Sequence, residues 1–306
     1  MANVLKREKQ MHVLHLLVNG SSIRAAERVT GIHRDTICRL VVRFGEACRE
    51  WMDNQMQNLT IRHLELDEQW TYCGKKQARL TVDEKLTRYD QGDIYLWIGI
   101  DQETRLVPSF ALGKRSADMA RRFAVDLAGR MTRPNPHASD AHAYGSGGYL
   151  QRVQISTDGF AAYAEAIDLA FGPYADHGII IKEYRNAGMQ YDPGEMVGTQ
   201  RRTVSDAIDP WTICTSHVER LNGTTRLFMK RFNRLTYCFS KKLENLAAAT
   251  AMYLAYYNWC WRSRYPDNSG KRGRKRPTPA MAAKLTGHVW SFQELFDTVL
   301  PAKVAA

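Results

Sequence analysis

Acidic residues occur at three points of the chain where the surrounding pattern predicts a regular secondary-structure element. Asp67 lies in a stretch of alternating apolar and polar residues that predicts a β-strand, and Asp158 follows a short stretch, 152–157, that predicts another. Glu219 lies near the start of a predicted amphipathic helix. Two strands and a helix that each supply a carboxylate have to pack as a sheet with helices against it, so the pattern predicts an α/β fold.

The predicted helix that carries Glu219 begins with the sequence His-Val-Glu-Arg-Leu-Asn. Arg226 follows Glu219 by two turns, because an α-helix has about 3.6 residues per turn, so both side chains share one face with Asn222 between them. The apolar stripe of the same helix extends to Leu235 and consists of Val218, Leu221, Phe228, Phe232 and Leu235. The helix is therefore expected to pack along its apolar side and to present a carboxylate, an amide and a guanidinium along its flank.

Carboxylates supplied in this way suit a two-metal site for phosphoryl transfer. Mg²⁺ and Mn²⁺ take oxygen ligands, and two ions about 3.5 to 4 Å apart stabilise both the attacking and the leaving oxygen of an in-line displacement. Asp67, Asp158 and Glu219 are therefore the candidate catalytic residues and metal ligands, with Glu68 as the main alternative to Asp67. Each acid also has a simpler interpretation, as a solvated strand face, a turn before Gly159 or surface charge.

Composition indicates a globular protein with a polyanionic partner. The chain has 306 residues, 44% of them hydrophobic, which is enough for a sizeable core and about two domains. Lys and Arg outnumber Asp and Glu by 43 to 32, and the net charge of +11 suits a nucleic acid, although a soluble basic protein would show the same excess. The six cysteines contain no Cys-x-x-Cys pair, so neither a zinc site nor a disulfide framework is predicted.

The first 58 residues are predicted to form an all-α helix-turn-helix domain that binds DNA. Apolar spacing predicts three helices between residues 9 and 53, with turns at Asn19–Gly20 and Gly31. The third helix is the candidate for the major groove, because its outer face carries Arg34, Arg39 and Arg43. A plain three-helix bundle remains the alternative.

Residues 62–262 are predicted to form the catalytic domain, a mixed sheet flanked by helices. The polar stretch 74–93 is interpreted as a hairpin or loop, and 132–149 as a long loop. Further strands are expected at 94–100, 106–112 and 178–184, and helices at 116–131, 160–171 and 241–261, with 186–211 irregular. The aromatic residues of the last helix are expected to pack in the core.

Residues 263–306 are predicted to form a basic linker and a C-terminal helical tail. The linker carries a basic cluster that could lie on phosphates: Lys271, Arg272, Arg274, Lys275 and Arg276. No signal peptide and no apolar stretch of 18 residues is visible, so we expect neither export nor a membrane partner, and a protein that works in the cytoplasm, where DNA lies.

Three sequence blocks resemble a known family, the DDE transposases of bacterial insertion sequences of the insertion-sequence-one type. The blocks are Leu-Asp-Glu-Gln-Trp-Thr-Tyr-Cys-Gly-Lys-Lys at 66–76, Ser-Thr-Asp-Gly-Phe-Ala-Ala-Tyr at 156–163, and His-Val-Glu-Arg-Leu-Asn-Gly-Thr-Thr-Arg-Leu-Phe-Met-Lys-Arg at 217–231. In this order they are specific, and the resemblance covers about residues 62–262. One departure is the lack of the cysteine-bearing zinc segment with which such proteins often begin.

The resemblance implies a ribonuclease H-like fold and a DNA transposase that cleaves the 3′ ends of an element and joins them to a target. It implies two Mg²⁺ or Mn²⁺ ions on Asp67, Asp158 and Glu219, and an oligomer that holds double-stranded DNA of the element ends and the target. Arg226, Lys230 and Arg231 are expected to contact that DNA near the scissile phosphate. His217 is expected to contact the DNA or to orient Glu219, with a helix-capping or packing histidine as the alternative. The alternatives are a ribonuclease H-like nuclease or resolvase, and a non-catalytic helix-turn-helix regulator.

Overall fold

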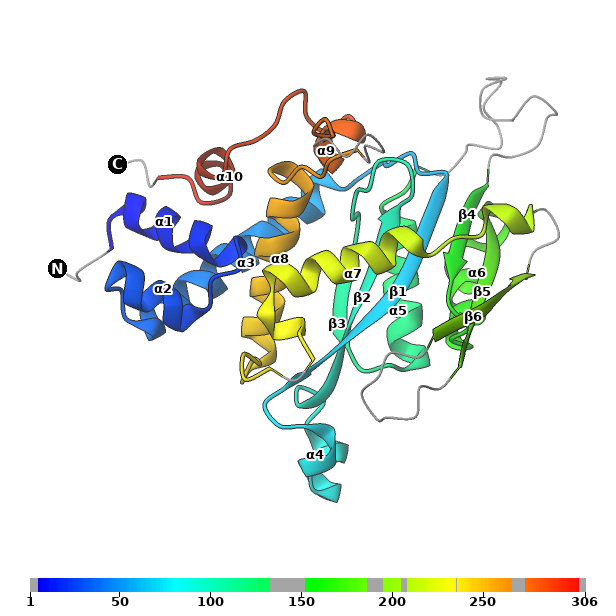
Figure 1. Cartoon of the computed structure of the whole chain (residues 1–306), viewed down its shortest axis with the longest axis horizontal. Helices are drawn as coiled ribbons and strands as arrows, with labels where there is room; N and C mark the ends of the chain where they lie inside the picture. The colour runs from blue at the N-terminus through cyan, green and yellow to red at the C-terminus, as the bar shows by residue number, and fades with distance from the viewer. Residues whose placement is uncertain are drawn as a thin grey trace.

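A computed structural model of the chain describes residues 5–132, 152–185, 195–204, 208–234, 236–265 and 273–302 (Figure 1). The loop predicted at 132–149 therefore lies outside the described residues except for Thr132, and so do Leu235, Lys271 and Arg272. No helix within the described ranges is both long and apolar enough to cross a membrane.

A six-stranded mixed sheet forms the centre of the described structure, in the order β3-β2-β1-β4-β5-β6. β1 runs antiparallel to β2 and parallel to β4, which is itself parallel to β5. β3 and β6 pair antiparallel with β2 and β5. The strands are β1 at His63–Cys73, β2 at Gly92–Asp101, β3 at Phe110–Gly113, β4 at Val153–Thr157, β5 at Ala175–Arg185 and β6 at Glu195–Thr203. The predicted mixed α/β sheet is confirmed, and its order is compatible with a ribonuclease H-like fold.

Helices cover both faces of this sheet (Figure 1). α5 (Ala117–Gly129) and α6 (Ala162–Phe171) pack together behind it, and α7 (Ser216–Phe228) crosses the opposite face over β1 and β2. Trp97 of β2 is fully buried on the α5 and α6 side, with its ring 6.3 Å from Phe123 and 5.8 Å from Tyr163. This aromatic layer fixes the sheet against its rear helices.

The N-terminal helices share a core with the rest of the chain. α1 (Arg7–Val18), α2 (Ile23–Thr30) and α3 (Arg34–Gln55) confirm the three predicted helices, and α3 packs along α8 (Leu243–Trp259). Gly45 makes this crossing close, since a Cβ there would lie 2.1 Å from the Ala248 carbonyl oxygen. One hydrophobic cluster extends from α1 and α3 through α8 to the sheet. The DNA-binding role of this region, and the domain boundary near residue 60, stay predictions.

Two further contacts tie the helical part to the sheet. Gly20, in the turn after α1, meets the end of α7, where a Cβ added to the glycine would lie 3.5 Å from the Leu227 carbonyl oxygen. Arg130, whose side chain is only 10% exposed, donates to Asp53 of α3 at 2.6 Å and to Asp126 of α5 at 2.8 Å. The N-terminal helices are therefore held to helices on both faces of the sheet.

The C-terminal tail returns to the N-terminal helices. α10 (Phe292–Val299) follows the short α9 (Pro279–Ala282) and packs against α1, α3 and α8. Arg7 donates to Asp297 at 2.6 Å, and its guanidinium lies 4.7 Å from the centre of the Phe296 ring. The predicted basic linker is paired where it is described: the backbones of Arg264 and Lys275 form an antiparallel bridge.

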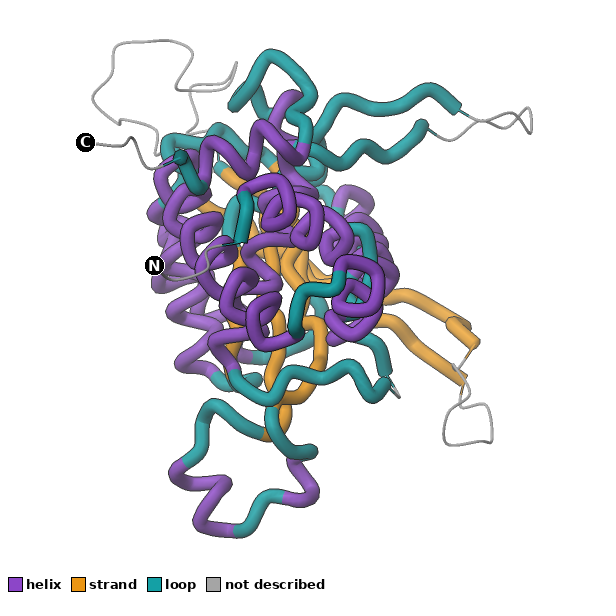
Figure 2. Tube along the Cα trace, turned by 90° about the vertical axis from the view of Figure 1, so that its left-hand side faces the viewer, coloured by secondary structure: helices purple, strands orange, loops and turns teal. Residues whose placement is uncertain are grey.

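The structure corrects several predicted boundaries. β3 begins at Phe110 and not at residue 106, because Pro108 has no N–H to donate to a ladder. α7 ends at Phe228 and not at residue 235, because the backbone of Met229, the next residue, leaves the helical region with φ −119° and ψ 90°. The segment expected to be irregular at 186–211 contains β6. The stretch 74–93 carries the capped helix α4 (Val82–Thr87), which extends away from the body of the molecule (Figures 1 and 2).

All six cysteines are free, and Cys48 and Cys73 are buried in the core. The aromatic side chains of α8 that face the core are Tyr253, Tyr257 and Trp259, each at most 5% exposed, so core packing is confirmed for these.

Candidate active site

Asp67 and Asp158 lie at the same level of two neighbouring parallel strands. Glu65 of β1 pairs with Ser156 of β4, so the residues two places further along each strand are also level. Asp158 follows directly after β4 and accepts a hydrogen bond from the Phe160 backbone N–H at 2.9 Å, which fixes its carboxylate in a turn. Carboxylate oxygens of Asp67, Glu68 and Asp158 lie within 4.8 Å of one another.

Glu68, the alternative to Asp67 named from the sequence, belongs to this cluster. Its side chain is only 2% exposed, and it accepts a hydrogen bond from Arg115 Nε at 3.1 Å. The same guanidinium reaches Asp158 at 3.5 Å and lies 4.1 Å from the centre of the Phe160 ring. Arg115 thus balances part of the negative charge that the clustered carboxylates create.

Glu219 approaches from α7 on the other side of Asp67. Its Oε1 accepts hydrogen bonds from Thr215 Oγ1 at 2.8 Å and from the Lys182 ammonium of β5. Burial is the main cause of the raised pKa of Asp67; the negative charge of Glu219 also raises this pKa, and the positive charge of Lys182 lowers it. Within the described part of the chain the tightest oxygen cluster contains Glu68, whereas Glu219 is engaged by Lys182.

A polar strip on β1 aligns α7 over the site. Asn222 Nδ2 donates to Asp67 Oδ2 at 2.6 Å, and Gln69 Nε2 donates to the Asn222 carbonyl oxygen at 3.0 Å. Thr71 donates to the carbonyl oxygen of Arg231 at 2.7 Å, just beyond the helix. Because these residues alternate along one face of β1, the strand and the helix are held in register by side chains and not only by apolar packing.

Burial raises the pKa of two clustered acids. Burial is the main reason that the pKa of Asp67 rises to about 6 and that of Glu68 to about 7, and repulsion from Asp158 adds to both. The hydrogen bond from the Glu68 backbone N–H lowers the pKa of Asp67, and the positive charge of Arg115 lowers the pKa of Glu68. Burial therefore disfavours the ionised forms of Asp67 and Glu68 near neutral pH, and bound divalent cations would stabilise those forms.

The residues expected to contact DNA differ in exposure. Arg34, Arg39 and Arg43 are exposed on α3, and Lys230 is exposed after α7. Arg226 is half-buried, its charge acts on that of Asp67, and its buried Nε has no hydrogen-bond partner among the described residues.

Two other expected DNA contacts are engaged within the protein. Arg231 lies in a short turn just after α7 and donates to Ser240 Oγ at 2.5 Å. His217 is bound to Glu65, with its Nδ1 2.5 Å from Glu65 Oε1. Their predicted contacts with DNA stay predictions.

Sequence patterns did not identify Lys182, Arg115 or the Glu65–His217 pair. Lys182 is the first charged residue after the apolar run of β5, and Arg115 directly precedes the Ser116 cap of α5, so both had a weak local signal. Their roles depend on partners 37 and 47 residues away, which no local period reveals.

The donor set fits hard divalent cations. Carboxylate oxygens are the ligands that Mg²⁺ and Mn²⁺ prefer, and the clustered oxygens of Asp67, Glu68 and Asp158 converge from adjacent positions. Glu219 would join them if its carboxylate turned from Lys182.

Comparisons with known proteins give a weak structural similarity. No family model and no curated protein sequence matches the chain. Among solved structures it is similar to a piggyBac transposase, seen by cryo-EM in a synaptic complex with hairpin DNA, with a TM-score of 0.42 and 12% identity, covering 96% of this chain and 71% of that one. A similarity of this strength carries no argument, so any function has to be argued from the residues of the chain itself.

Proposed function

We propose that the protein is a DDE-type DNA transposase that cleaves the 3′ ends of an insertion sequence and joins them to target DNA. The observation that carries the proposal is the approach of Asp67, Asp158 and Glu219, three acids identified from the sequence, on one side of a mixed sheet. Two of them belong to an oxygen cluster within 4.8 Å, and the third acts electrostatically on Asp67.

In this proposal Asp67 and Asp158 hold divalent cations and Glu219 completes the site. The bound ions would activate a water and later a DNA 3′-hydroxyl, and would stabilise the leaving 3′-oxygen. Asn222 keeps the Asp67 carboxylate oriented through its hydrogen bond of 2.6 Å. Lys182 holds Glu219 until a cation competes for the carboxylate, so this lysine supplies positive charge in the absence of metal.

Charge distribution supports DNA as the substrate. The net charge is +11, and exposed arginines on α3 lie on the part of the molecule that the end of α7 contacts. Arg226, whose Nε has no hydrogen-bond partner among the described residues and whose charge acts on that of Asp67, could donate to a phosphate oxygen beside the acids. Oligomerisation on DNA, the insertion-sequence-one type and a location in the bacterial cytoplasm remain part of the proposal.

The decisive experiment measures strand cleavage and joining by the purified full-length protein. Labelled DNA from each side of the coding sequence is incubated with Mg²⁺ or Mn²⁺, with wild type, Asp158→Asn and the control Asp168→Asn, an exposed acid of α6 outside the site. We expect metal-dependent 3′-end cleavage and joining that only Asp158→Asn abolishes. Cleavage without joining would favour a nuclease, and DNA binding without cleavage by any variant would favour a regulator.

A further inference from the structure

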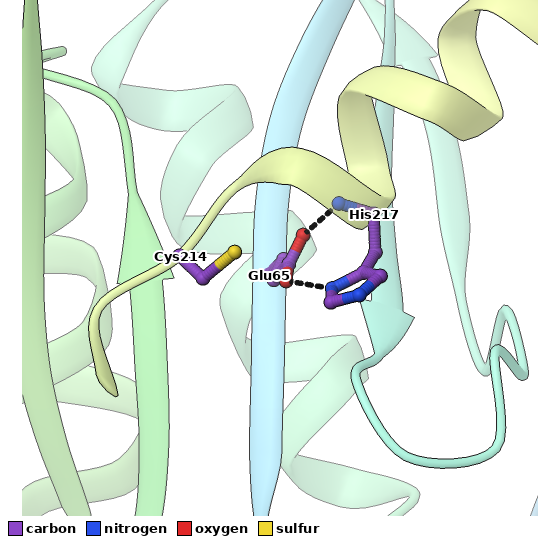
Figure 3. Close-up of side chains that lie close together, drawn as sticks. All are labelled: Glu65, Cys214 and His217. Carbon is purple, nitrogen blue, oxygen red and sulfur yellow. Dashed lines mark hydrogen bonds and ion pairs between the residues drawn. The ribbon is translucent and has the colours of Figure 1, made fainter. Parts of the chain in front are cut away.

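A second group of metal-ligating side chains lies at the start of α7, separate from the carboxylate cluster. Glu65 of β1, Cys214 and His217 place a carboxylate oxygen, a sulfur and an imidazole nitrogen within 4.8 Å of one another. Figure 3 shows Cys214 and His217 on opposite sides of Glu65, with the sulfur pointing toward the carboxylate. We propose that these three residues bind a zinc ion.

The donor set distinguishes this site from the acidic one. Sulfur, nitrogen and oxygen together are the ligands of Zn²⁺, whereas Mg²⁺ and Mn²⁺ favour oxygen alone. Cys214 lies in the loop that enters α7, and His217 follows three residues later in the first turn of the helix, a spacing like that of many zinc ligand pairs. The third ligand is 152 residues away from His217 in the sequence, so the pattern of cysteines alone did not predict a zinc site.

The surroundings of each ligand leave a donor atom for a cation. Glu65 is 1% exposed, and its Oε2 accepts the backbone N–H groups of His217 at 2.8 Å and Val218 at 2.9 Å. These bonds fix the carboxylate and direct Oε1 toward the imidazole. Oε1 and His217 Nδ1 are 2.5 Å apart, so they share a hydrogen that a cation would displace.

Cys214 is supported in the same way. Its sulfur accepts a hydrogen bond from the Ser216 backbone N–H at 3.4 Å and lies 3.0 Å from Ser216 Oγ. Hydrogen bonds of this kind orient metal ligands from the outer shell. Tetrahedral ligands of Zn²⁺ lie about 3.3 to 3.8 Å apart, so side-chain movements of roughly 1 Å bring the three atoms to ligand distance. Cys214 and His217 are only half-buried, which gives an ion access.

Zinc at this position would fasten the first turn of α7 to β1. The ion would join the helix that carries Glu219 to the strand that carries Asp67, so it would fix the distance between two acids of the proposed catalytic site. This consequence rests on the proposed function, whereas zinc binding itself does not.

Cobalt absorption on the full-length protein tests the site directly. The protein is freed of metal with a chelator, given excess Mg²⁺ to fill the carboxylate cluster, and titrated with Co²⁺, whose bond to a thiolate gives a charge-transfer absorption. We expect one equivalent of Co²⁺ to give this absorption and Zn²⁺ to remove it. Cys214→Ser should abolish the absorption, and His217→Gln should weaken metal affinity at least about 10-fold.

Matched controls show whether the absorption arises because Cys214 binds the cobalt ion. Cys238→Ser removes a half-buried cysteine outside the cluster and should leave the titration unchanged. Equal melting temperatures of the variants in chelator show that they fold, and zinc should raise the melting temperature of wild type but not of Cys214→Ser. No absorption in the folded wild type, or an absorption that survives Cys214→Ser, would overturn the proposal and leave Glu65 as a cap of α7. No DNA is present, so the result is independent of any cleavage assay.

Discussion

Glu68 makes the pH dependence of stability a direct test of the clustered carboxylates. Its pKa is about 7 in the folded protein, mainly through burial, compared with an ordinary value of 4.5. The folded state therefore binds more protons than the unfolded state between these two pH values, so stability falls as pH rises from about 4.5 to about 7. Glu68→Gln, whose amide resembles the protonated acid in shape, removes this cost.

The size of the effect follows from the pKa difference. About 2.5 pKa units at about 1.4 kcal/mol each give roughly 3 kcal/mol at pH 8. The side chain is 2% exposed, so solvent screening does little to reduce this value. Glu68→Gln should therefore unfold with a free energy about 3 kcal/mol higher than wild type at pH 8, and with a free energy similar to wild type at pH 4.

Urea denaturation in chelator at pH 4 and pH 8 measures the prediction. Glu165→Gln serves as the control, because Glu165 pairs with Arg121 on the surface at 59% exposure and should change stability by less than about 0.5 kcal/mol at either pH. Saturating Mg²⁺ should reverse the order at pH 8, since wild type gains a ligand that the variant lacks. An equal change at both pH values, or a less stable variant at pH 8, would refute the assignment of the raised pKa to Glu68.

Three further predictions concern other contacts. Gly45→Ala should destabilise the protein by about 3 kcal/mol in urea denaturation, because its Cβ would lie 2.1 Å from the Ala248 carbonyl oxygen. The control Gly223→Ala, on the open face of α7, should stabilise the protein by about 0.5 to 1 kcal/mol. Similar changes for both variants would contradict the close crossing of α3 and α8. Lys182→Met should tighten Mn²⁺ binding in calorimetry, since it frees the Glu219 carboxylate, and weaker binding would show that the ammonium does not compete with the ion. Arg39→Ala should weaken DNA binding and reduce the slope of log affinity against log salt by about 1, and an unchanged slope would remove α3 from the DNA interface.

The order of elements was predictable where burial leaves a period in the sequence. Leu64 and Leu66 alternate with polar residues on β1, and the core of β2 is continuously apolar, so both strands were expected. β6 was missed because it is an edge strand with an exposed, largely polar surface and no apolar alternation. The helix of Glu219 was predicted too long, since Phe232 keeps the apolar spacing and is fully buried after the chain has left the helix.

Part of the candidate site was predictable for a different reason. Asp67, Asp158 and Glu219 each stand at the predicted end or face of an element, which gives them a local signal. The partners that set their charge come from elsewhere: Arg115 holds Glu68 and Asp158, and Lys182 holds Glu219. Such pairs join residues that are far apart in the sequence, so no local sequence pattern identifies them.

The contact between Gly20 and the end of α7 fixes the distance between the N-terminal helices and Glu219. Residues 219 to 228 of a helix span about 13 Å at 1.5 Å per residue, so the acid at one end is a fixed distance from the N-terminal helices at the other. A DNA-reading module on a loose tether would tolerate variable spacing between its binding sequence and the cut. In the proposed function the rigid helix would fix the spacing between the DNA-binding sequence and the cut, so inserting or deleting one base pair between them should move the cut by one nucleotide relative to the element's end.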